Sequence, residues 1–271
     1  MKGSEHMAQV TNTGIIDAPS FVTARRALGI SKTYIAMTVF MMVLAIAVWN
    51  PAYYARGGLL NNSTSNSITG NVLPGGSISS PHKAADSFTG LPFLAVPLNM
   101  IPAMMIASAV LILFVYDKNN GVLEYLLSLG MTQRGIYMRY LKATLLLVIV
   151  ESIIFTIADS LYIWEFFGIK SLAAIIPVLL ITIPFSLSIM AFMVIAMMAF
   201  SSLQKMRAGS NQPLGLVVGA AASIPGYFIP FALPFMEAFY ADIAMIAIMA
   251  CISAAFLAYS GKLIRREKFL P

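Results

Sequence analysis

The chain has 271 residues, of which 59% are hydrophobic and only 10% are charged, and its formal net charge is +6. Soluble domains carry about 25% charged residues, so this composition indicates an integral membrane protein and excludes an ordinary soluble domain. Basic residues in such a chain are first interpreted as signals of membrane topology, and we expect no nucleic-acid partner. The single cysteine, Cys251, excludes a disulfide within the chain.

The N-terminal region contains two expected parts. Residues 1–16 begin with MKGSEHM, which is typical of an expression tag, and we expect them to be disordered. Residues 17–32, DAPSFVTARRALGISK, place Phe21, Ala24 and Leu28 on one helical face, with two arginines beside it. This pattern predicts a short helix in the cytoplasmic membrane interface. A disordered basic tail is the alternative.

Six apolar segments are long enough to cross a membrane as helices, which takes about 20 residues. They lie at roughly 33–50, 94–116, 140–163, 172–200, 212–233 and 238–260. We therefore expect an all-α polytopic membrane protein with six transmembrane helices within residues 33–260. The fifth segment carries Pro225, Pro230 and Pro234 near its end, so a broken or re-entrant piece is one interpretation of it.

The basic residues orient these segments. Fourteen of the 17 Lys and Arg residues fall in residues 1–32, 117–142, 201–211 and 261–271, and the other three are Arg56, Lys83 and Lys170. Cytoplasmic segments of membrane proteins carry such an excess of positive charge. We therefore expect a plasma-membrane protein with both termini in the cytoplasm, including the basic tail at 261–271.

The largest external segment is the expected loop 51–93, which is rich in Gly, Ser and Asn and is predicted to be flexible. Residues 61–64, NNST, fit the acceptor pattern for N-glycosylation. A chance match in an Asn- and Ser-rich loop is the alternative interpretation.

Sequence patterns of enzymes are missing. The chain has no HExxH pair, no Gly-rich phosphate loop and no GxSxG turn. Two His and one Cys are too few for a metal site built from the usual ligands. We therefore expect no catalytic residues, no cofactor and no metal in this chain.

Two carboxylates lie inside the third expected span. Glu151 falls near its middle, and Asp159 follows eight residues later, within about 80° on the same helical face. Charges at this depth are expensive and usually face the protein interior. One interpretation is a substrate-path or proton-coupled site. The other is a protonated or hydrogen-bonded Glu151 that packs one helix against another.

A polar insert, residues 117–139, separates the second and third expected spans. Apolar residues recur within 122–127 at helical spacing, so the insert is predicted to contain a short amphipathic helix. Asn120 is expected to cap its start, and Gly130 is expected to end it in a left-handed conformation. Thr132 is then expected to cap the helix that enters the third span.

The stretch DKNNGVLEYLLSLGMTQRGIYMRYLK, residues 117–142, resembles the cytoplasmic loop of permease subunits in the type 2 ATP-binding-cassette (ABC) exporter family. That loop typically reads acidic-basic, then Gly-Thr-x-Glu-x-Leu-Leu, then a short turn and a Lys entering the next span. The matching positions here are Gly121, Glu124, Leu126, Leu127, Arg134 and Lys142. Val122 replaces the common Thr, and Gly130-Met131 stands where Pro is usual. The six-span order, the interfacial helix and the basic tail agree, so the resemblance covers nearly the whole chain.

The resemblance implies a half-transporter. Two six-span permease subunits, identical or different, would form the pathway, and two separate ATPase subunits would bind ATP and Mg on the cytoplasmic side. The insert would be the coupling helix seated in the ATPase, with contact residues Gly121, Glu124, Leu126, Leu127, Gly130 and Arg134.

Two other functions fit the same sequence. An ion-coupled secondary carrier would use Glu151 and Asp159 directly, driven by a gradient without an ATPase. A membrane scaffold would have the same spans and transport nothing.

Overall fold

A computed structural model describes residues 18–30, 32–55, 95–167, 169–200, 215–233 and 235–258. Within them the chain forms α-helices and no strand, in agreement with the expected all-α class. The helices are α1 (Ala18–Ile30), α2 (Lys32–Ala55), α5 (Ala95–Asn119), α6 (Val122–Ser128), α7 (Gln133–Phe167), α8 (Ile169–Ala199), α9 (Gly215–Ala232) and α10 (Phe235–Ala258). The expected tag, most of the loop 51–93 with its NNST stretch, and the basic tail lie outside the described residues.

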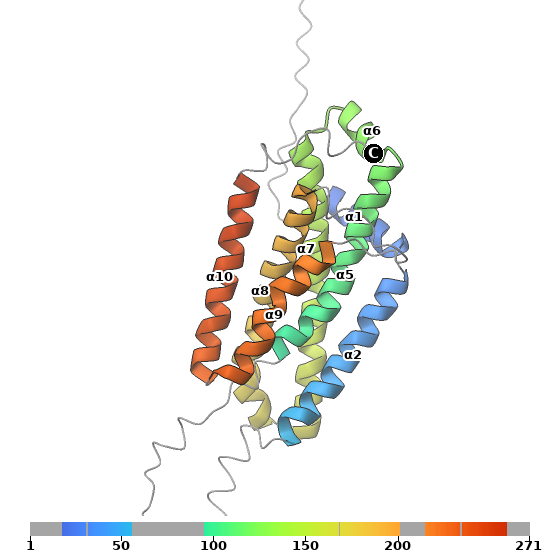
Figure 1. Ribbon diagram of the computed structural model, residues 1–271. Coiled ribbons are helices and arrows are strands. Elements are labelled where there is room, and N and C mark those ends of the chain that lie inside the picture. The colour runs from blue at the N-terminus through green and yellow to red at the C-terminus, as the bar shows by residue number, and fades with distance from the viewer. Residues whose placement is uncertain are drawn as a thin grey trace, which may run out of the picture.

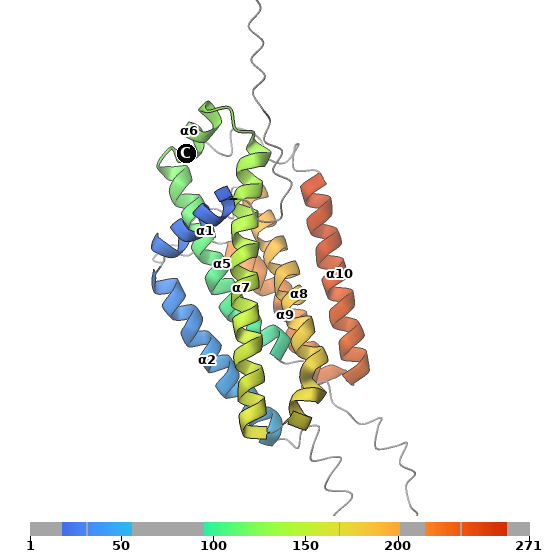
Figure 2. The ribbon, with the colours of Figure 1, turned by 180° about the vertical axis from the view of Figure 1, so that it is seen from behind.

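The described helices other than α1 and α6 run roughly along one axis and alternate in direction along the chain: α2, α5, α7, α8, α9 and α10 (Figures 1 and 2). The short α6 lies beyond the long helices, at the end of the bundle where α5 ends and α7 begins; we call this the α6 end. Helix α1 lies toward the same end, and its axis is bent by 86° from that of α2. The N-terminal helix and the polar insert therefore meet at one end of the bundle.

Among the described residues, four helical segments are long and apolar enough to cross a membrane: Ala95–Asn119, Gln133–Glu165, Ile176–Met197 and Met236–Ala258. A fifth span is possible if α1 and α2 are counted as one bent unit. The four coincide with the second, third, fourth and sixth expected spans, and α2 and α9 occupy the other two. The fold is thus that of an all-α, multi-pass membrane protein, and the count of six spans stays a prediction.

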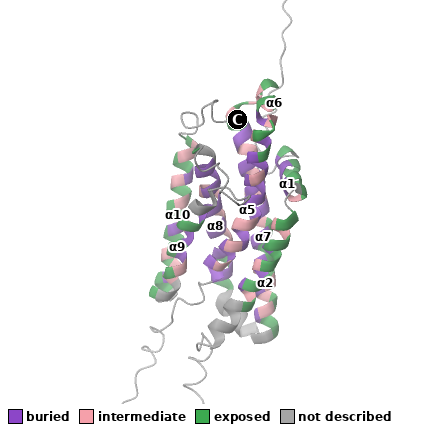
Figure 3. Ribbon diagram, turned by 45° about the vertical axis from the view of Figure 1, so that its right-hand side comes forward, coloured by how far each residue is buried: buried purple, intermediate pink, exposed green. Residues whose placement is uncertain are grey.

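Helix α5 forms the centre of the bundle and packs against α1, α2, α7, α8 and α9. Most of its residues are buried (Figure 3). A series of small side chains at Ala103, Ala107 and Ser108 lies on its buried surface, and small residues let neighbouring helices approach closely inside membranes. By contrast, most described side chains of α10 are exposed or half-buried.

The face of α1 that was expected to enter the membrane interface is divided between two environments. Ala24 and Ala27 are buried against the bundle, Leu28 is half-buried against it, and Phe21 is exposed. Because α1 packs against both α5 and α7, it is part of the fold of the bundle and not a detached surface helix.

Helix α9 is continuous from Gly215 to Ala232, so the structure does not show the broken segment considered for this region. Pro225 lies on its exposed side, and the neighbouring Gly226 is buried. A Cβ atom on Gly226 would lie 2.8 Å from Cζ of Phe185 and 3.7 Å from Cβ of Pro97. The missing side chain therefore allows α9 to approach α8 and α5 closely.

Gly226→Ala is expected to lower the melting temperature of the protein in detergent, because a Cβ atom there would overlap the fully buried ring of Phe185, which would have to shift. Overpacking of this kind typically costs about 1–3 kcal/mol. Gly29→Ala in α1 is the matched control, since a Cβ there meets nothing within 4 Å. Equal melting temperatures for the two variants would show that α9 is not tightly packed at this point.

Candidate functional site

Helix α6 is bounded by two glycine turns. Gly121 precedes it with φ of 72° and Gly130 follows it with φ of 85°, values that glycine adopts without steric cost. At the C-terminal end, the N–H of Gly130 donates to the carbonyl of Leu127 (3.1 Å) and the N–H of Met131 to that of Leu126 (3.2 Å). This pair of bonds is a Schellman motif. The predicted left-handed helix end at Gly130 is therefore confirmed.

The two other predicted caps have different outcomes. Thr132 does cap α7, because its Oγ1 accepts a hydrogen bond from the N–H of Gly135 (3.1 Å). The prediction that Asn120 caps α6 was wrong. The N-cap position is occupied by Gly121, and the Nδ2 of Asn120 instead donates to the carbonyl of Tyr116 (2.9 Å) at the end of α5. The side chain of Asn120 thus binds to the last turn of α5 and does not cap α6.

One side of α6 holds the helix against the bundle. Leu123 is fully buried in the hydrophobic core, and Leu126 and Leu127 are half-buried against the same core. The sequence predicted an apolar face here, and the structure shows that the chain's own helices cover part of it.

The opposite side of α6 is exposed and partly apolar. Tyr125 and Leu129, one helical turn apart, are 63% and 61% exposed. Glu124 beside them and Arg134 at the start of α7 are also exposed. The insert therefore presents an exposed face to which Tyr125 and Leu129 contribute the large apolar groups; we call this the α6 tip.

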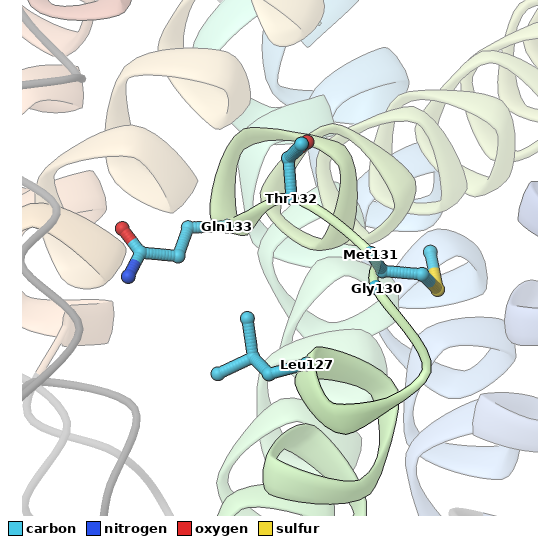
Figure 4. A pocket seen from close by; sticks show the side chains of 5 residues that line it. All are labelled: Leu127, Gly130, Met131, Thr132 and Gln133. Carbon is cyan, nitrogen blue, oxygen red and sulfur yellow. The ribbon is translucent and has the colours of Figure 1, made fainter. Parts of the chain in front are cut away.

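A shallow pocket of about 290 Å³ lies at the turn between α6 and α7. Leu127, Gly130, Met131, Thr132 and Gln133 line it (Figure 4). The side chains of Leu127 and Gln133 extend to the same side of the turn, whereas Met131 extends to the other side. The turn thus offers a small recess beside the α6 tip.

A polar cluster ties α1 to the two helices that flank the insert. Asp117, fully buried at the end of α5, accepts hydrogen bonds from Arg26 of α1 (2.9 and 3.4 Å) and from the hydroxyl of Tyr140 in α7 (2.6 Å). Close by, the Nε of Arg139 donates to the Oγ1 of Thr23 (2.6 Å). We call these five residues the α1 clamp. They join α1 to the end of α5 just before α6 and to the beginning of α7 just after it.

Glu151 lies in the interior of the bundle, as expected, and is 4% exposed. Its Oε2 accepts a hydrogen bond from the hydroxyl of Ser152 (3.1 Å). The Nδ2 of Asn99 in α5 donates to Ser152 (3.1 Å) and to Ser186 in α8 (2.9 Å). These four side chains form the Asn99 cluster, which connects α5, α7 and α8. The sequence singled out Glu151 but not its neighbours from the other two helices.

The second predicted carboxylate, Asp159, is fully buried in α7. It lies eight residues beyond Glu151, or roughly 12 Å along the helix axis, so the two carboxylates do not form one site. A further buried carboxylate inside an expected span was missed. Asp242 in α10 is 1% exposed, and neither of its carboxylate oxygens has a hydrogen-bond partner among the described residues. Because Asp242 lies inside the sixth expected span, where charged residues usually face the protein interior, the sequence could have indicated its burial.

Within the described part of the chain, no three His, Cys, Asp or Glu side chains converge on a position that would hold a metal ion. Comparison with family models, curated proteins and solved structures gives no match. Fold and composition thus define an all-α, multi-pass membrane protein, and its function has to be inferred from the two polar clusters and the α6 tip.

Proposed function

We propose that this chain is the transmembrane permease subunit of an ABC exporter and that α6 is the helix through which a separate ATPase subunit drives it. The observation that carries the proposal is the exposed α6 tip on a helix that is otherwise firmly anchored. Leu123 is buried, glycine turns fix both helix ends, and Tyr125 and Leu129 remain uncovered. A linker between two spans has no need of such a rigid apolar protrusion. The resemblance of residues 117–142 to coupling loops of this family supports the same conclusion.

In this proposal, ATP and Mg bind to the ATPase partner, and the chain itself is not an enzyme. A second permease subunit, identical or different, completes the substrate pathway. The α6 end faces the cytoplasm, and the described start of α1 and end of α10 lie toward that end. The basic residues concentrated in 117–142 and in the two terminal segments support this orientation in the plasma membrane.

The structure refines the expected contact surface. Leu126 and Leu127 were expected to bury against the ATPase, but both are half-buried against the chain's own core. Tyr125 and Leu129 are the larger uncovered groups, and aromatic residues are enriched among the energetically dominant residues of interfaces. We therefore propose that Tyr125 and Leu129 make the main apolar contact, with Glu124 and Arg134 in polar contact beside them and Leu127 lining the adjacent recess.

Tyr125→Ala/Leu129→Ala is expected to weaken binding of the ATPase subunit at least tenfold, which corresponds to about 1.4 kcal/mol. ATP-dependent transport should fall with it. The measurement is co-purification of an ATP-binding subunit, followed by titration of that subunit against the reconstituted permease. The matched control is Tyr116→Ala, which removes an exposed tyrosine at the end of α5, outside α6. Failure of the wild-type chain to retain any ATP-binding subunit, or equal binding by the double variant, would contradict the proposal.

The orientation makes a separate prediction. A tag inserted at residue 70 should be accessible from outside the cell, and a tag at residue 209 only after permeabilisation. The reason is that residues 201–211 belong to the basic, cytoplasmic set, whereas the loop 51–93 lies on the other side. Antibody labelling of intact and permeabilised cells measures both. Detection of both tags on the same side of the membrane would overturn the six-span order.

The Asn99 cluster favours one rival function, an ion-coupled carrier, because it contains a carboxylate deep in the bundle. Such a carrier would accumulate substrate in vesicles that contain no ATPase subunit when an ion gradient is imposed. A scaffold would transport nothing under either condition. Reconstitution with and without the ATPase subunit therefore distinguishes the three functions.

A further inference from the structure

We propose that the Asn99 cluster is a binding site for one small monovalent cation, such as Na⁺, held by side-chain oxygens of α5, α7 and α8. The site lies about 27 Å along α7 from its first residue, Gln133, so it is remote from the α6 tip. The proposal does not depend on the ATPase partner.

Hydrogen bonds within the Asn99 cluster leave two acceptors unmatched. The Nδ2 of Asn99 donates to the hydroxyl oxygens of Ser152 and Ser186, and the hydroxyl of Ser152 donates to Glu151. The Oδ1 of Asn99 and the Oε1 of Glu151 are both buried and have no hydrogen-bond partner among the residues that the structure describes. Asn99, Ser152 and Ser186 are fully buried, so bulk water does not reach these oxygens. The cluster therefore has an excess of acceptors in a place where unmatched acceptors are unfavourable.

A single bound cation would supply the missing partner for both unmatched oxygens. Two free acceptor oxygens and the hydroxyl oxygens of Ser152 and Ser186 are the hard ligands that alkali and alkaline-earth cations prefer. An ionised Glu151 carries one negative charge, and a single buried charge is stabilised by a partner of equal and opposite charge. A monovalent ion leaves the site neutral, whereas a divalent ion would leave one uncompensated positive charge inside the bundle.

Because the ligands come from three helices, cation binding links α5, α7 and α8 and must stabilise the folded state over the unfolded one. We expect the melting temperature of the purified full chain in detergent to be higher in one alkali chloride than in choline chloride at equal concentration. The rise should be roughly 3–6 °C at a cation concentration about ten times Kd. Choline serves as the reference because it is too large to enter a cluster of this size.

The experiment compares NaCl, LiCl, KCl and choline chloride for the wild type and three variants. Glu151→Gln removes the charge and Ser186→Ala removes one hydroxyl oxygen, so both should abolish the cation-specific rise. Ser188→Ala is the matched control, because this buried serine of α8 donates to its own helix, at the carbonyl of Phe185 (2.9 Å). It should keep the full rise. Retention of ²²Na⁺ by the wild-type chain, displaced by the other alkali chlorides but not by choline chloride, provides a direct measurement that does not require the variants to fold.

Two results would overturn the proposal. Equal melting temperatures in all four chlorides, with no retained ²²Na⁺, would show that a water molecule or a proton satisfies the two acceptors. A cation-specific rise that persists in both Glu151→Gln and Ser186→Ala would place the ion elsewhere in the protein.

Discussion

Arg26→Met is expected to lower the melting temperature by roughly 4–8 °C, the largest change that we anticipate for a single charged residue. The substitution leaves Asp117 fully buried, and among the described residues the hydroxyl of Tyr140 is its remaining side-chain donor. Removing one partner of a fully buried ion pair costs about 3–5 kcal/mol. Because Arg26 is 43% exposed, we expect about 2 kcal/mol here, which converts to this change for a chain of this size.

The double variant Arg26→Met/Asp117→Asn tests the reason for that loss. An asparagine at position 117 still accepts the bond from Tyr140 but carries no charge, so no buried charge is left without a partner. The double variant should therefore be more stable than Arg26→Met alone. If the losses of stability from the two single substitutions simply add in the double variant, Arg26 and Asp117 act independently and do not form an ion pair in the purified protein.

Leu123→Ala is expected to cost about 2–5 kcal/mol, because it removes a fully buried side chain from the base of α6. The anchoring of the helix should weaken, and residues 121–131 should become more sensitive to limited proteolysis. If the proposed function is right, binding of the ATPase subunit should fall as a consequence, since the α6 tip is no longer held in one position.

Leu129→Ala is the matched control for Leu123→Ala, since both remove the same atoms from the insert, at positions six residues apart. Leu129 is 61% exposed, so its loss should change stability by no more than about 0.5 kcal/mol. If the proposed function is right, Leu129→Ala still reduces ATPase binding. Equal melting temperatures of the two variants would mean that α6 is not anchored by Leu123.

The turns around the insert could be predicted from the sequence because their causes are local. Gly130 and Thr132 act on residues only a few positions away, through a left-handed turn and a cap. The prediction that Asn120 caps α6 was wrong because its side chain could bind to either of two neighbouring helix ends, the end of α5 or the start of α6, and it binds to the end of α5.

The polar clusters could not be predicted from the sequence because their contacts are distant along the chain. Arg26 and Asp117 are 91 positions apart, and Asn99 is 53 positions from Ser152 and 87 from Ser186. Only the packing of α5 between α1, α7 and α8 brings them together. The sequence did not predict the burial of Asp117, since an aspartate at the end of a span is usually expected to lie in water.

Helix α7 has the properties of a lever. It runs without proline through 35 residues, a rod about 50 Å long, whereas its neighbour α8 contains Pro177 and Pro184. Glu151 lies next to the midpoint of α7, so the Asn99 cluster lies where a tilt of the helix would move it least. Tilting the rod by about 10° would move each end by about 4–5 Å in opposite directions. If the proposed function is right, a displacement of the turn after α6 would therefore produce an opposite displacement at the other end of α7, while the contacts of the Asn99 cluster hardly change.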